Sequence, residues 1–125
     1  MFYKRATLAL LIAGLSSTAF AACPKPSDPP TNFPDGAKAS RAEMMKAKES
    51  VDNYVASARD FIDCVDTDEA AELKKIDADT KMDKDTKAEK LKAIQDRHEQ
   101  RNKVVSQMQA IANRFNDEVH KFNKQ

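Results

Sequence analysis

Two long stretches of the chain repeat apolar residues at alternating steps of three and four. The first stretch carries Met44, Ala47, Val51, Tyr54, Val55, Ala58, Phe61, Ile62 and Val65, and continues more weakly to Leu73 and Ile76. The second carries Leu91, Ile94, Val105, Met108, Ala112, Phe115, Val119 and Phe122, with polar His98 and Arg101 at two of its positions. This spacing places the apolar side chains on one face of an α-helix. The pattern therefore predicts two long amphipathic helices.

Polar residues set the expected limits of these helices. Ser40 followed by Glu43 is a capping-box pattern, and Thr86 with Glu89 offers a second one. We expect a helix over about 40–77, a turn over about 78–85 and a helix over about 86–123. Asp66 starts a polar run that could cap a new helix, so the first helix either continues past this residue or breaks there. Two helices of nearly equal length joined by a short polar turn predict an all-α fold, a long antiparallel hairpin resembling a coiled coil.

The segment before the first helix is rich in proline. Residues 22–39 contain all five prolines of the chain, and Asp35-Gly36 adds a turn signal. Because proline fixes φ and lacks an amide donor, this segment is predicted to be an extended arm. Only two glycines occur in the chain, which argues against a fold built on tight hairpin turns.

Residues 1–21 have the three-part layout of a secretory signal peptide. Lys4 and Arg5 precede the uncharged apolar run Ala6–Leu15, and small residues follow, with a cleavage site expected after Ala21 or one residue later. The apolar run is about ten residues long, well short of the ~20 that a transmembrane helix needs. We expect a periplasmic or secreted protein without a transmembrane anchor after cleavage.

Two cysteines remain after this segment, Cys23 and Cys64. Cys23 follows Phe20-Ala21-Ala22, which loosely resembles a lipobox, so a lipid-modified Cys23 is one alternative. An even pair of cysteines in an exported chain favours a disulfide instead. The arm is long enough, at about 50 Å, to reach back the roughly 36 Å from Ser40 to Cys64 along a helix.

Composition excludes several kinds of chemistry. The chain is 33% charged with a formal net charge of +1, so no basic excess favours nucleic acid. The aspartates after Asp77 lack the glycine and glutamate of a calcium loop, because Met82 and Ala88 stand at those positions. His98 and His120 are too far apart on one helix to share a metal. No catalytic arrangement is indicated, so we expect no enzyme, cofactor or metal site.

A resemblance to a family of proteins rests on residues between Cys23 and Cys64. They are Cys23-Pro24, the run Pro34-Asp35-Gly36-Ala37, and Met44, Val51, Tyr54, Phe61 and Cys64. The chain resembles a group of small exported proteobacterial proteins with a signal peptide, Cys-Pro, a proline stretch, Pro-Asp-Gly-Ala and a helix with a second cysteine. The resemblance spans roughly residues 20–65. It implies export and a cysteine pair, and it implies no activity.

These features predict a binding or structural module of the cell envelope that contacts itself or another protein through the helical stripe. Its expected contact residues are Val51, Tyr54, Phe61, Met108, Phe115 and Phe122. A holdase-like or inhibitor protein is one alternative, and a carrier of a small apolar ligand is another.

Overall fold

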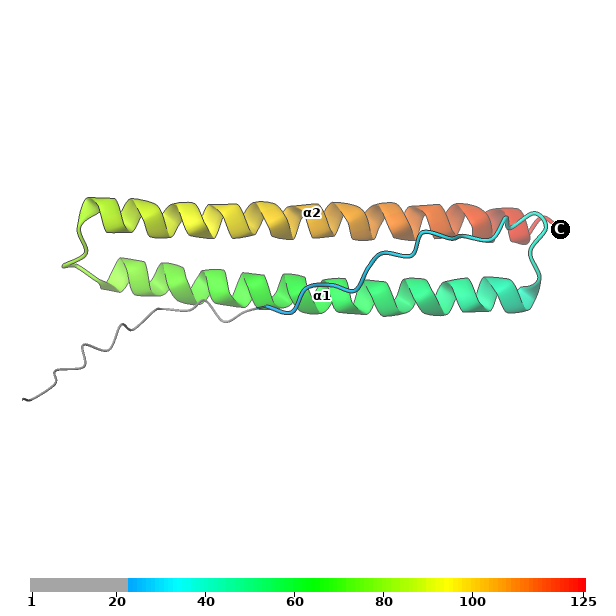
Figure 1. Cartoon of the computed structure of the whole chain (residues 1–125), viewed down its shortest axis with the longest axis horizontal. Helices are drawn as coiled ribbons and strands as arrows, with labels where there is room; N and C mark the ends of the chain where they lie inside the picture. The colour runs from blue at the N-terminus through cyan, green and yellow to red at the C-terminus, as the bar shows by residue number, and fades with distance from the viewer. Residues whose placement is uncertain (1–22) are drawn as a thin grey trace, which may run out of the picture.

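The computed structural model describes residues 23–125. The predicted signal peptide, residues 1–21, lies outside the described residues. Two α-helices, α1 (Arg41–Ala78) and α2 (Lys84–Phe122), run antiparallel and pack along their length (Figure 1). Residues 23–125 contain no strand. The predicted all-α hairpin is therefore confirmed.

Side-chain caps determine where both helices begin. Ser40 and Glu43 form the predicted capping box, in which each side chain accepts a hydrogen bond from the other residue's backbone amide. The second helix starts at Lys84, two residues before the expected boundary at 86, because Asp83 is its N-cap and accepts from the amide of Thr86. α1 continues without a break past Asp66.

The core is concentrated on α1. Its buried residues are Met44, Val51, Tyr54, Ala58, Phe61, Ile62, Val65 and Ile76, whereas Ile94 alone is buried on α2. Near the turn the packing is thinner, since Leu73 and Leu91 are 41% and 40% exposed. The half of the hairpin away from the turn therefore holds most of the buried apolar surface.

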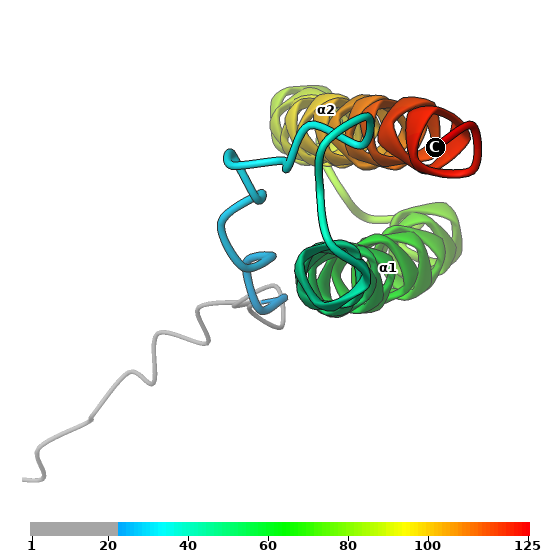
Figure 2. The ribbon, with the colours of Figure 1, turned by 90° about the vertical axis from the view of Figure 1, so that its right-hand side faces the viewer.

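The proline-rich arm, residues 23–39, forms a third layer over one side of the hairpin (Figure 2). It begins beside the middle of α1, crosses to α2, and follows α2 to the open end of the hairpin before α1 begins (Figure 1). Ser27 hydrogen-bonds Ser57 of α1, and the ring of Phe33 lies under the guanidinium of Arg114 at 4.6 Å. The arm therefore bridges the two helices.

Gly36 anchors the arm at the open end. Its amide donates to Glu118 Oε2 at 2.7 Å, and Gln125 donates to the carbonyl oxygens of Gly36 and Ala39. The hydrogen bond from Gly36, followed by Lys121, lowers the pKa of Glu118. A carboxylate with a lowered pKa favours folding above the ordinary carboxyl range, and that contribution is lost as pH falls through the lowered value.

Candidate functional site

A groove lies between the first part of the arm and the two helices. It has a volume of about 530 Å³, within the size range of small-molecule sites. We call it the arm groove. It is lined by Cys23, Lys25, Pro26, Ser27, Asp28 and Pro29 of the arm, Tyr54, Phe61 and Val65 of α1, and Arg97, Gln100, Val104 and Gln107 of α2.

The floor of the arm groove is apolar and deeply buried. Tyr54, Phe61 and Val65 are only 2%, 8% and 1% exposed. They lie on one face of α1, because steps of three and four along the sequence bring successive side chains to the same side of the helix. Since the arm covers this face incompletely, an apolar ligand that entered the groove would meet side chains that are already ordered.

The hydroxyl of Tyr54 is the unusual polar group of this floor. Its oxygen is buried and has no hydrogen-bond partner among residues 23–125. Burial raises the pKa of Tyr54, which keeps the hydroxyl protonated and able to donate. An unpaired buried hydroxyl costs about 1–3 kcal/mol.

We expect Tyr54→Phe to raise the free energy of unfolding by about 1 kcal/mol, because it removes the unpaired hydroxyl and keeps the ring. Urea unfolding followed by circular dichroism measures the change. Ser57→Ala is the contrasting variant, since the Ser57 hydroxyl bonds Ser27 and the carbonyl of Tyr54, and it should lower stability. Equal destabilisation by both variants would contradict this reading of Tyr54.

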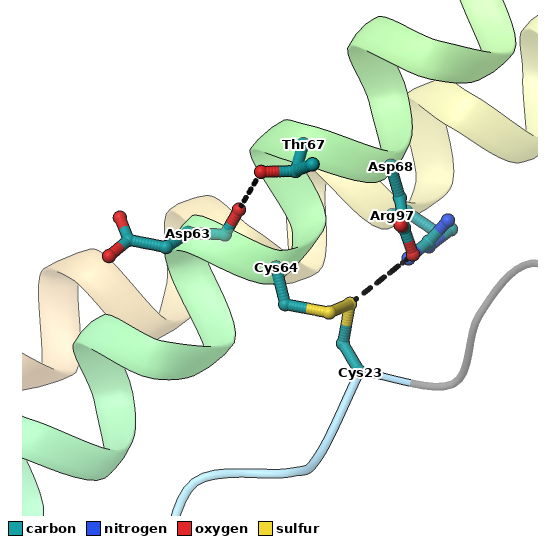
Figure 3. Close-up of a disulfide and its surroundings, with 6 residues drawn as sticks. All are labelled: Cys23, Asp63, Cys64, Thr67, Asp68 and Arg97. Atoms are coloured by element: carbon teal, nitrogen blue, oxygen red, sulfur yellow. Dashed lines mark hydrogen bonds and ion pairs between the residues drawn. A yellow bond between two sulfur atoms is a disulfide. The ribbon is translucent and has the colours of Figure 1, made fainter.

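The predicted disulfide, drawn in Figure 3, lies at the Cys23 end of the arm groove. Cys23 and Cys64 are bonded, with their Cα atoms 5.7 Å apart. The guanidinium of Arg97 lies 3.5 Å from Cys23 Sγ and 3.3 Å from Asp68 Oδ2. Asp68 Oδ2 also lies 3.5 Å from Cys23 Sγ, a contact without a hydrogen because a disulfide sulfur carries none. Arg97 of α2 thus meets both the arm and α1 at this point.

Three residues here have the side chains of metal ligands, but two of them are already bonded to each other. Cys23, Cys64 and Asp68 offer ligand atoms within 4.8 Å of one another. Because both sulfurs are in the disulfide, they provide no thiolate for a metal ion.

One further ion pair and one histidine–carboxylate contact join the helices next to the disulfide. Arg101 binds both carboxylate oxygens of Asp66 at 2.8 and 3.0 Å, and His98 Nδ1 lies 3.1 Å from Glu69 Oε2. The hydrogen bonds that Arg101 donates to Asp66 raise the pKa of Arg101. The sequence pattern puts His98 and Arg101 at polar positions of the stripe but does not predict these partners. Opposite charges at facing positions of the predicted hairpin were the available signal.

The structure separates the six predicted contact residues into two groups. Val51, Tyr54 and Phe61 are buried within the chain, and Tyr54 and Phe61 line the arm groove. Met108, Phe115 and Phe122 are partly buried on α2 and do not line it. The groove residues that the sequence did not indicate come from the arm and from the polar positions Arg97, Gln100 and Gln107.

Comparisons with family models, curated proteins and solved structures find no match to this chain. Within residues 23–125, neither helix has a stretch apolar and long enough to cross a membrane.

Proposed function

We propose that this chain is an exported binding protein whose arm groove holds a small, uncharged and largely apolar ligand. The arm groove itself, with its volume of about 530 Å³ and its apolar floor, carries the proposal. Export is supported by the signal-like N-terminal sequence and by the disulfide, a bond that persists in oxidising compartments. The groove favours a ligand carrier over association through the stripe, because half of the stripe's contact residues are already buried inside the chain.

The charges around the groove indicate an uncharged ligand. Arg97 is paired with Asp68, and the arm contributes both Lys25 and Asp28 to the lining. These opposite charges leave little net field to attract an anion or a cation. Gln100 and Gln107 add exposed amides that can donate to and accept from polar atoms of a ligand. A ligand with an apolar body and one or two uncharged acceptors matches this lining.

Binding is tested with N-phenyl-1-naphthylamine, an uncharged apolar probe whose fluorescence rises in apolar surroundings. We expect the native protein to bind it with saturation and Val104→Trp to weaken binding about tenfold or more, because the larger ring fills the groove from α2. Val105→Trp is the matched control. Val105 is also a half-buried valine of α2 but does not line the groove, so its replacement should leave binding unchanged.

Two results would overturn the proposal. One is the absence of saturable binding by the native protein at probe concentrations up to its solubility. The other is an equal loss of binding in Val104→Trp and Val105→Trp, because a shared loss reports a general loosening of the hairpin.

A further inference from the structure

The two sulfur atoms of the disulfide have unequal surroundings. Arg97 Nη2 lies 3.5 Å from the sulfur of Cys23, and the close-up shows the guanidinium on the Cys23 side of the bond (Figure 3). Cys23 belongs to the extended arm, whereas Cys64 is held in the middle of α1. Both cysteines are partly exposed. The guanidinium therefore contacts the sulfur of the arm cysteine, whereas the other sulfur belongs to a cysteine within α1.

We infer that this disulfide is a site of thiol–disulfide exchange in which Cys64 is attacked and Cys23 leaves. The thiolate of an external dithiol attacks Cys64 Sγ, a new S–S bond forms there, and the Cys23–Cys64 bond breaks with its electron pair on Cys23 Sγ. Arg97 stabilises the departing thiolate by charge. The second thiol of the reductant then displaces Cys64 and closes a disulfide in the reductant. Two electrons pass from the dithiol to the protein, which ends with two thiols.

Asp68 acts against Arg97 in this step. Its carboxylate lies 3.5 Å from the same sulfur and repels the negative charge that develops on it. It also pairs with Arg97 at 3.3 Å and neutralises part of the guanidinium charge. The two residues therefore tune the departure of Cys23 in opposite directions, and Asp68 restrains a bond that Arg97 makes easier to break.

Exchange would release the Cys23 end of one wall of the arm groove, while the hydrogen bonds between Ser27 and Ser57 still hold the middle of that wall. Cys23–Pro29 forms this wall, and the covalent attachment of that segment is the disulfide. The attachments of Phe33 to Arg114 and of Gly36 to Glu118 lie further along the arm. A dithiol therefore opens the groove from its Cys23 end while the arm stays docked at the open end. This consequence rests on the proposed ligand site, whereas the exchange chemistry does not.

The exchange step is tested by the rate at which dithiothreitol reduces the native, oxidised protein, with free thiols trapped by alkylation and counted by mass. We expect Arg97→Gln to slow reduction by about three- to tenfold and Asp68→Asn to accelerate it by about two- to fivefold. The inference requires the reduction rate to change in opposite directions in the two variants. If the Asp68–Arg97 pair only held the arm in place, both variants would loosen it and both would accelerate reduction.

Arg101→Gln and Asp66→Asn are matched controls, because they break an ion pair between the same helices that does not contact the sulfurs. Neither should change the rate by more than about twofold. Glutathione, a monothiol, maps the attacked sulfur, and the mixed disulfide is expected on Cys64. Reduction of Arg97→Gln at or above the native rate, or a mixed disulfide mainly on Cys23, would overturn the inference. Neither readout requires a groove ligand, so failure of the ligand proposal would leave this result intact.

Discussion

Replacing both Cys23 and Cys64 by serine is expected to lower the free energy of unfolding by about 4 kcal/mol. The bond closes a loop with a sequence separation of 41 residues, and opening it returns the conformational freedom of that loop to the unfolded chain. A hairpin with one buried residue on α2 has little other core to offset such a loss.

Urea unfolding of the double variant and of the native protein measures this difference. Both cysteines are replaced together so that no unpaired thiol remains to form dimers. Ser106→Ala serves as the control for a small polar change on the exposed surface of α2 and should leave stability within about 0.5 kcal/mol of native. A loss below about 1 kcal/mol in the double variant would show that the arm is held without the bond.

Gly36→Ala is expected to detach the arm from α2 and to lower stability by about 2–3 kcal/mol. A Cβ at Gly36 would overlap the backbone carbonyl oxygen of Glu118 and lie 2.8 Å from its carbonyl carbon. The obstacle is helix backbone, which cannot turn aside as a flexible side chain can. The clash would also remove the hydrogen bond from the Gly36 amide to the Glu118 carboxylate.

Amide hydrogen exchange locates this effect. The amide of Gly36 and those of the following turn should lose protection in Gly36→Ala, while amides in the middle of α1 keep theirs. Ala37→Ser, an exposed change in the same turn, is the matched control and should behave like the native protein. Native-like protection in Gly36→Ala would mean that the arm can dock in another way.

The hairpin could be predicted from the sequence because its signals are local. The steps of three and four define each helix, and Ser40 with Glu43 fixes the start of α1. The start of α2 was placed two residues late because Asp83 and Thr86 both have capping side chains, and only the backbone geometry shows that Asp83 is the N-cap. The local pattern therefore predicts both helices and places the start of α2 two residues too late.

The arm groove could not be predicted, because it depends on where the arm crosses between the helices. Phe33 meets Arg114 and Gly36 meets Glu118 across more than half of the chain, and nothing in the local sequence specifies those pairs. The cysteine pair predicts one point at which the arm is attached, and Gly36 predicts only a turn. Its close approach to α2 is a tertiary requirement that the Asp-Gly pattern does not reveal.

The disulfide also changes the covalent topology of the chain. Cys23 and Cys64 turn the segment between them, which includes the whole arm and the first half of α1, into a closed ring. One proteolytic cut inside a ring opens it without releasing a fragment. A protease that cleaves after Lys38 in the exposed turn would add one water to the mass and leave the severed arm covalently attached to α1. Two cuts, or one cut and a reductant, are needed before any part of the groove wall can leave the protein.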